Sequence, residues 1–306
     1  MVIKKNKSKR ANFNWLTVVM LVVLAAYSVM LIGLILWGVM TMFKNYDLDF
    51  QNNSYRLPNE WSWGKNGMEI AIVENFNKVM DATIYGRDPT TGQQYPMEIW
   101  QLFLNGFLYA FGCAFMHTLV ACITSYFCAR YKYKFSKLMY SMVLIVMIIP
   151  VVGNLPSEIQ MAKTLNLYNQ LWGLWIMRAN FLGMYFLVFH EFFKSLPDSY
   201  TEAAKIDGAG NVSILLRIAL PLAKNLFLTV LLINFITFWN DYQVPLIYLP
   251  RYPTISYAVF QWTTERQLKV PQQMLASVLL LVPILIIFLC TNQKLLGNLT
   301  VGGIKG

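Results

Sequence analysis

Charged residues are scarce in this chain. Only 13% of its 306 residues are charged, 57% are hydrophobic, and the mean hydropathy is +0.45. An ordinary soluble domain carries about twice that share of charge, so this composition excludes one. Apolar stretches long enough to cross a bilayer recur along the sequence, which favours a single polytopic membrane domain.

Histidine and cysteine are also scarce. The two histidines lie 73 positions apart, and the four cysteines stand in apolar segments without metal-ligand or disulfide spacing. We therefore expect no metal site and take the cysteines to be small core residues. The sequence also lacks the Gly-x-x-x-x-Gly-Lys-Ser/Thr loop that cradles phosphates, so energy has to come through a partner or an ion gradient.

Six apolar segments predict transmembrane helices. The expected spans are Trp15–Phe43, Ile99–Ala129, Leu138–Ser157, Leu171–Phe189, Pro221–Pro245 and Met274–Gln293. The first is too long for the core of a signal peptide, so we expect it to be retained. The predicted fold class is an all-α polytopic membrane protein with six transmembrane helices.

Lys and Arg predict which side each connection faces. The net charge of +10 comes from basic residues beside the apolar spans, a pattern of membrane orientation and not of nucleic-acid binding. With the N-terminus inside, inner segments hold fifteen Lys and Arg and outer segments nine. We therefore expect both termini to be cytoplasmic.

This orientation predicts the organisation of the chain. It consists of a basic N-terminus (1–14), a first span (15–43), an extracytoplasmic loop (44–98) and a core with the other spans (99–306). The outer loop is too polar to span the bilayer. We expect a partly ordered cap there, with a docking surface for an external partner as the alternative.

The inner loop from His190 to Lys224 carries eight charges in an otherwise apolar chain. Ser199 or Asp198 can cap a short helix over Tyr200–Ile206, and Gly208 can end it in the left-handed conformation. A second helix is expected over 212–220. Such a protruding helix suits docking of a cytoplasmic partner. The alternative is an interfacial helix on lipid headgroups, which its small apolar residues and balanced charges disfavour.

This loop resembles the EAA loop of the inner-membrane permeases of ATP-binding cassette importers. The family pattern is Glu-Ala-Ala, three residues, Gly, nine residues, Ile, one residue and Leu-Pro. The matching positions, without a gap, are Glu202, Ala203, Ala204, Gly208, Ile218, Leu220 and Pro221. The stretches 206–209 and 239–242 and the glycine-rich tail 299–306 are similar to carbohydrate-importer permeases of the MalG type.

The resemblance implies a permease subunit for a sugar or oligosaccharide in the cytoplasmic membrane of a bacterium or archaeon. The implied partners are a second, MalF-type permease, two copies of an ABC ATPase and an extracytoplasmic solute-binding protein. The chain would have no cofactor of its own, since the ATPase binds ATP and Mg. The implied ATPase-coupling residues are Glu202, Ala203, Ala204, Asp207, Gly208, Leu220 and Pro221.

Polar residues in apolar spans are costly and are therefore candidates for the substrate path. The candidates are Asn154 and Gln160, which follow the break at Pro150, and Asn234, Trp239 and Asn240. Planar amides can bind sugar hydroxyls and aromatic faces can bind sugar rings. The alternative is interhelical hydrogen bonding.

Two charged residues near span ends have alternatives of their own. Arg178 either extends to the outer surface or lines a cavity. Asp241 is either solvated at a helix end or takes part in gating.

Two other classes of protein remain as alternatives. An ion-gradient transporter would need acidic ion sites within the membrane, yet no Asp or Glu lies in the middle of a predicted span. A lipid-linked membrane transferase would need clustered acids or histidines at the membrane surface.

Overall fold

The computed structural model describes residues 15–64, 69–131, 133–149, 153–265 and 267–299, with side chains described up to residue 290. The expectations for the N-terminus (1–14), for Pro150 and for the tail after residue 299 lie outside these residues. The chain forms two compact units. Unit 1 takes its residues from Met1–Val79 and Lys269–Val278, and unit 2 from Met80–Leu268 and Leu279–Gly306.

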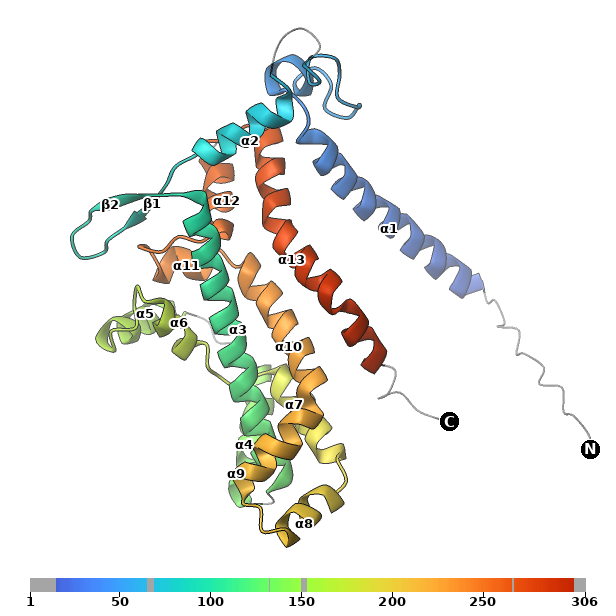
Figure 1. Ribbon diagram of the computed structural model, residues 1–306, viewed down its shortest axis with the longest axis vertical. Coiled ribbons are helices and arrows are strands. Elements are labelled where there is room, and N and C mark those ends of the chain that lie inside the picture. Colours follow the sequence, from blue (N-terminus) through green and yellow to red (C-terminus); the bar gives the residue numbers. More distant parts are fainter. Residues whose placement is uncertain (1–14, 65–68, 132, 150–152, 266, 300–306) are drawn as a thin grey trace, which may run out of the picture. The chain divides into compact units, whose positions relative to one another are not determined.

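The described chain is mostly helical, as predicted, and Figure 1 labels its elements. In order they are α1 (Trp15–Thr41), the π-helix η1 (Tyr46–Phe50), α2 (Ala71–Asp81), β1 (Ile84–Arg87), β2 (Gln94–Met97), α3 (Ile99–Arg130), α4 (Lys134–Ile148), α5 (Leu155–Thr164), α6 (Leu171–Met177), α7 (Met184–Ser195), α8 (Ser199–Ile206), α9 (Asn211–Ile214), the π-helix η2 (Leu215–Ala219), α10 (Leu220–Asn240), α11 (Gln243–Tyr248), α12 (Ile255–Thr264) and α13 (Val270–Leu299). The antiparallel hairpin β1–β2 is a small departure from the all-α prediction.

Four of the predicted spans are single helices long and apolar enough to cross a membrane. They are Trp15–Thr41, Ile99–Arg130, Asn211–Asn240 and Val270–Cys290. At 1.5 Å per residue, the 27 residues of the first extend about 40 Å, which exceeds the roughly 30 Å hydrocarbon core of a bilayer. The fourth of these helices begins before the predicted Met274, and the third begins well before the predicted Pro221.

The other two predicted spans are each divided into separate helices. In the segment 138–157, α4 ends at Ile148 and α5 begins at Leu155. In the segment 171–189, α6 ends at Met177 and α7 begins at Met184. A run of apolar residues predicts that a segment is buried in lipid or protein. It does not predict where a helix within that segment ends and the next begins. The count of six spans therefore stays a prediction.

The core of unit 2 is formed by α3 with α7 and α10, which lie side by side (Figure 1). Small side chains at their contacts allow close approach of the backbones. One buried cluster contains Ala121, Cys122, Tyr126, Phe189, Phe193, Leu215, Ala219, Ala223 and Val230. Cys113 and Cys122 are fully buried, as predicted for small core residues, whereas Cys128 is half-buried and Cys290 is exposed, so the prediction is wrong for Cys290.

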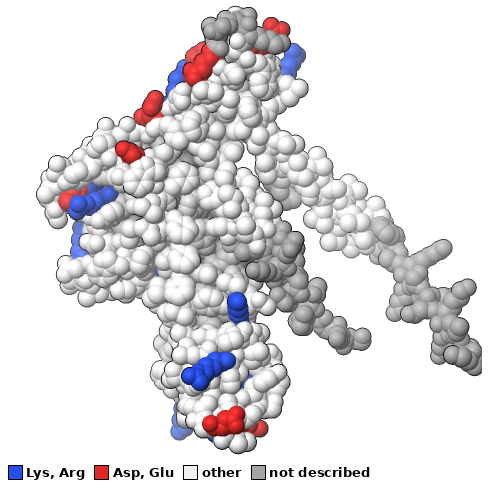
Figure 2. All heavy atoms as spheres, viewed as in Figure 1, with Lys and Arg blue, Asp and Glu red and all other residues white. Residues whose placement is uncertain are grey.

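The two ends of unit 2 differ in structure. The hairpin β1–β2 lies at one end and α8 at the other (Figure 1). In the face that Figure 2 shows, the coloured Lys, Arg, Asp and Glu of this unit gather toward these two ends, with uncharged surface between them. Uncharged surface bounded by charge at both ends is compatible with a bilayer, whose core disfavours charged groups.

Unit 1 contains a buried polar network in the predicted extracytoplasmic loop. The Lys44 ammonium is fully buried and donates to the Asn53 carbonyl at 2.5 Å. Burial lowers the pKa of Lys44, although the Asp49 carboxylate opposes this. Asp49 accepts hydrogen bonds from the Ser62 hydroxyl at 2.5 Å and from the Asn59 N–H at 2.9 Å. Polar contacts thus order this part of the loop.

Gly112 provides a test of the packing in unit 2. Trp175 lies against it and donates its indole N–H to the Leu108 carbonyl at 3.0 Å, and a Cβ on residue 112 would overlap the indole. We expect Gly112→Ala to lower the free energy of unfolding by about 1–3 kcal/mol, because the indole has to move. Thermal unfolding in detergent would measure this. Gly33→Ala is the control, since no atom lies within 4 Å of its added Cβ, and an equal effect would contradict the packing argument.

Candidate coupling surface

The α8 helix ends in a Schellman motif. The Ala209 N–H donates to the Ala204 carbonyl at 2.9 Å, and the Gly208 N–H donates to the Lys205 carbonyl at 3.0 Å. Gly208 has φ of +78°, in the left-handed region where a side chain adds strain. The predicted short helix and its glycine stop are therefore confirmed. No other residue lies within 4 Å of a Cβ at this glycine, so its requirement is for backbone conformation alone.

The start of α8 differs from the expected cap. Asp198 occupies the N-cap position but makes no side-chain capping hydrogen bond. Its carboxylate instead accepts a hydrogen bond from the Arg130 guanidinium at 2.6 Å. Arg130 ends α3, so this ion pair joins the short helix to a long one. Because Asp198 is exposed, the pair is worth at most about 1 kcal/mol and serves mainly to orient α8.

The predicted coupling residues differ in exposure. Glu202, Ala203, Asp207 and Gly208 are exposed, whereas Ala204 is buried within this chain. Of the two alanines expected to admit a partner, only Ala203 is therefore available. Ile206 is 87% exposed, an unusual position for a large apolar residue beside charged neighbours.

A hollow of about 180 Å³ runs beside α8. It is lined by Tyr126, Arg130, Tyr131, Asp198, Thr201, Glu202 and Lys205. The charged side chains of Glu202 and Lys205 in α8 therefore share this hollow with the aromatic ring of Tyr126 in α3. This mixture suits contact with a protein surface that has both apolar and charged groups.

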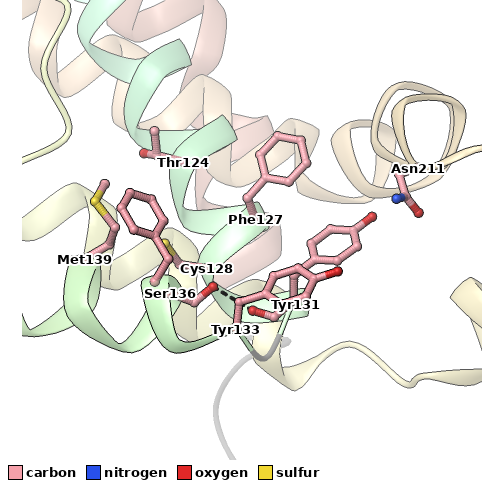
Figure 3. A pocket seen from close by; sticks show the side chains of 9 residues that line it. Thr124, Phe127, Cys128, Tyr131, Tyr133, Ser136, Met139 and Asn211 are labelled. Atoms are coloured by element: carbon pink, nitrogen blue, oxygen red, sulfur yellow. Dashed lines mark hydrogen bonds between the residues drawn. The ribbon is translucent and has the colours of Figure 1, made fainter.

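A larger hollow of about 350 Å³ adjoins the first at Tyr131 (Figure 3). Its walls come from the end of α3, the start of α4 and Asn211 of α9. Phe127 and Tyr131 stack at 5.7 Å between centroids, and Tyr131 and Tyr133 stack at 6.2 Å. The Ser136 hydroxyl donates to the Tyr131 carbonyl at 2.6 Å, which holds the chain reversal between the helices. The lining is mainly aromatic and apolar.

The chain from α8 joins a long helix through a π turn. The segment Asn211–Asn240 is continuous, and the Leu220 N–H donates to the Leu215 carbonyl in the π register. This turn precedes Pro221, which has no N–H and would clash with the carbonyl four residues earlier in a regular α-helix. Leu220 packs on the buried cluster of unit 2, and Pro221 is exposed. Leu220 and Pro221, which the resemblance implies as coupling residues, thus lie within a helix.

Two of the substrate-path candidates are committed to contacts inside the chain. Asn234 is buried and donates to the Thr118 hydroxyl at 3.0 Å, which joins α10 to α3. Trp239 is buried, and its indole N–H donates to the Leu280 carbonyl at 3.0 Å. For both residues these contacts correspond to the interhelical alternative, and they hold the helices together.

The other three candidates are exposed. Asn240 donates its amide to the Ile236 carbonyl of its own helix at 2.8 Å. The Asn154 side chain makes no cap for α5, and Gln160 lies on the same helix. Their side chains are therefore accessible, and the contacts of the described residues do not bring the five candidates into one site.

Asp241 makes several hydrogen bonds within the chain, although it lies at the end of a predicted span. Its carboxylate accepts hydrogen bonds from the Tyr109 hydroxyl at 2.8 Å and from the backbone N–H groups of Gln243 and Val244 at 2.9 and 3.2 Å. Its carbonyl accepts a bond from the Ser256 hydroxyl. It is therefore a structural junction between α3, α10 and the start of α11, and not simply solvated. Sequence could not identify Tyr109, which lies 132 positions away.

Arg178 lies in the break between α6 and α7. It is partly buried, and within the described residues its Nε has no hydrogen-bond partner. It is close enough to Tyr109 and Cys113 to act on both electrostatically. Its own carbonyl oxygen is 3.2 Å from Nδ1 of His117. Both alternatives for Arg178, extension to the outer surface and lining a cavity, stay predictions.

Among the residues that the structure describes, no group of three or more His, Cys, Asp or Glu side chains could hold a metal ion. The arrangement is a bundle of apolar helices with a short polar helix protruding at one end. Helices of this length and apolarity are typical of an integral membrane protein.

The chain belongs to the family of binding-protein-dependent transport system inner membrane components, which it matches over residues 121–295. This family consists of transport subunits and not of enzymes. The match confirms the prediction of an importer permease over the ion-gradient transporter and the membrane transferase.

Similar proteins include sugar and glycerol-phosphate permeases. The chain is 24% identical over 208 residues to the melibiose/raffinose/stachyose import permease protein MelC of Bacillus subtilis, covering 67% of this chain and 75% of MelC. It is 30% identical over 148 residues to the sn-glycerol-3-phosphate transport system permease protein UgpE of Salmonella typhi, covering 48% of this chain and 52% of that one. The aligned part thus spans about half of UgpE.

The fold is similar to that of a solved importer. A chain of a bacterial ABC transporter involved in the import of the acidic polysaccharide alginate matches with a TM-score of 0.67 at 18% sequence identity. The match covers 90% of this chain and 95% of that one. At this identity it supports the fold alone.

Proposed function

We propose that this chain is the MalG-type permease subunit of an ATP-driven importer for a sugar or oligosaccharide. The observation that carries the proposal is the family match together with the exposed α8 helix inside the matched segment. The relative MelC, which is named for melibiose, raffinose and stachyose, supports a carbohydrate substrate.

The proposed complex contains a second, MalF-type permease, two copies of an ABC ATPase and an extracytoplasmic solute-binding protein. ATP and Mg are bound by the ATPase. Both termini and α8 face the cytoplasm, and the hairpin β1–β2 faces outward. The opposite placement of α8 and the hairpin in unit 2 supports the assignment of these two elements to opposite sides of the membrane.

In this proposal α8 transmits the closure of the ATPase dimer to the membrane helices. Glu202 bonds to a groove of the ATPase, Ala203 admits close packing, and Asp207 with Gly208 forms the turn. Leu220 and Pro221 continue the chain into α10, which packs along α3. Movement of α8 then reorients the helices so that a central path opens alternately to each side.

The proposed substrate path uses the exposed candidates Asn154, Gln160 and Asn240 for contact with sugar hydroxyls. Asn234 and Trp239 position the helices around that path through their bonds to Thr118 and Leu280.

Reconstitution tests the function directly. We expect proteoliposomes that contain this chain, its partner permease, the ATPase and the binding protein to take up radiolabelled sugar only with internal ATP. Ionophores that collapse proton and sodium gradients should leave the rate unchanged. Raffinose is a suitable first probe because of the similarity to MelC. Uptake that persists without ATP and stops with ionophores would reject the proposal.

A further inference from the structure

A polar hollow of about 350 Å³ lies at the hairpin end of unit 2, opposite α8. Its lining comes from three separate segments: the turn after β1, the end of α5 with its connection to α6, and the connection between α11 and α12. The volume falls in the range of small-ligand sites, about 300–1,000 Å³.

Backbone hydrogen bonds hold these three segments together. The Asn169 N–H donates to the Tyr248 carbonyl at 2.9 Å, and the Arg251 N–H donates to the Asn169 side-chain oxygen at 3.0 Å. The Arg87 N–H donates to the Pro250 carbonyl at 2.7 Å. The walls of the hollow are therefore preorganised, which lowers the entropy that a ligand loses on binding.

The connection between α5 and α6 is tightly folded. Asn166 and Asn169 have φ of +55° and +60°, left-handed conformations that are uncommon outside glycine. Gly173 lies so close to the Leu167 carbonyl that a Cβ would overlap it. Asparagine adopts this conformation more readily than other residues with a side chain, so the turn is well formed and fixes the positions of Tyr168 and Asn169 in the lining.

The charge of the hollow is positive. Arg251 lies 3.7 Å from Asp88, whose pKa is lowered chiefly by the hydrogen bond from the Thr90 hydroxyl, so Asp88 stays ionised and offsets Arg251. The Lys163 ammonium lies 5.1 Å from the centroid of the Tyr168 ring. Within the described residues it forms no ion pair, which leaves one uncompensated cation in the lining.

We propose that this hollow binds one unit of an acidic oligosaccharide, with Lys163 on the sugar carboxylate and the Tyr168 and Asn169 side chains beside the ring. A planar carboxylate can pair with the Lys163 ammonium, which has the Tyr168 ring beside it but, among the described residues, no ion-paired acid. Aromatic rings and amides suit a polyhydroxylated ring. The inference builds on the proposed carbohydrate function and specifies an outer subsite for sugars that carry negative charge.

Binding of charged and neutral trisaccharides tests this subsite. The complex of the two permeases and the ATPase is placed in nanodiscs without the binding protein and titrated with trigalacturonate or maltotriose. We expect trigalacturonate to bind more tightly, and Lys163→Met to weaken it about tenfold to a hundredfold, as for loss of one charge-assisted hydrogen bond. Maltotriose binding should not change, and Lys163→Arg should retain most of the affinity for trigalacturonate.

Lys78→Met is the matched control, because Lys78 is an exposed lysine paired with Glu74 and does not line the hollow. Equal binding of both sugars, or equal effects of the two methionine variants, would overturn the inference. So would an effect of Lys163→Met on affinity for the solute-binding protein alone, which would make the hollow a protein contact. ATP-driven uptake is measured in the same preparations, so loss of the subsite is separable from failure of the transport proposal.

Discussion

Gly208→Val is expected to reduce ATP-driven uptake at least tenfold while the ATPase continues to hydrolyse ATP. Gly208 ends α8 with φ of +78°, and a β-branched side chain there is strained by about 1–3 kcal/mol. The chain can relieve this strain by unwinding the last turn of α8, which removes the Schellman bonds to Ala204 and Lys205. A helix without a fixed end cannot transmit the motion of a docked partner. Uptake and hydrolysis in the same proteoliposomes measure the coupling ratio.

Gly210→Ala is the control for that variant. Gly210 has φ of −71°, which alanine adopts freely, and no atom lies within 4 Å of its added Cβ. We expect its coupling ratio to stay within about twofold of the parent, since surface changes without strain are nearly neutral. Normal transport by Gly208→Val, with the complex intact on size-exclusion chromatography, would show that α8 is not the coupling element.

Asp241→Ala is expected to lower the free energy of unfolding by about 2–4 kcal/mol and to abolish most transport. The substitution removes the acceptor for the Tyr109 hydroxyl and for two backbone N–H groups at the start of α11. Hydrogen bonds to charged groups contribute about 1.5–3 kcal/mol each, and the partial exposure of Asp241 reduces the total. Thermal unfolding in detergent and uptake in proteoliposomes would report the two effects.

One further variant isolates the Tyr109 hydrogen bond, and another is a control for the loss of an exposed carboxylate. Tyr109→Phe removes one bond and should cost about 1 kcal/mol. Asp81→Ala changes an exposed carboxylate at the end of α2 and should lie within about 0.5 kcal/mol of the parent. If Asp241→Ala matched Asp81→Ala, the junction would contribute nothing, and simple solvation of a helix end would be the correct description.

Local signals in the sequence predicted α8 well. The predicted helix over Tyr200–Ile206 differs from the observed one by a single residue, and the role of Gly208 as its stop is confirmed. Helix ends depend on residues within one turn, so a sequence contains their signals. The cap failed for a different reason: Asp198 bonds to Arg130, 68 positions away, and a local pattern contains no information about such a partner.

Long-range contacts account for most of what the sequence could not predict. The amide of Asn234 is paired with Thr118 across 116 positions, and nothing near either residue distinguishes this bond from a sugar contact. The segments 138–157 and 171–189 were each predicted as one span, although the sequence marks a break at Pro150 and a charge at Arg178. The structure ends a helix at Ile148 and another at Met177. Hydrophobicity continues across such breaks and does not locate them. Hydropathy measures the preferred solvent of a segment, whereas tertiary packing decides where its backbone turns.

The uninterrupted helix Asn211–Asn240 has a mechanical consequence. Its 30 residues extend about 45 Å, from a point three residues after Gly208 to the residue before Asp241. From its π turn at Leu215–Ala219 onward it continues as α10, and a small tilt of α10 displaces its far end by several ångströms with no relay of side chains. Tilting of the end beside α8 would therefore move Asp241 at the other end, together with its hydrogen bond from the Tyr109 hydroxyl.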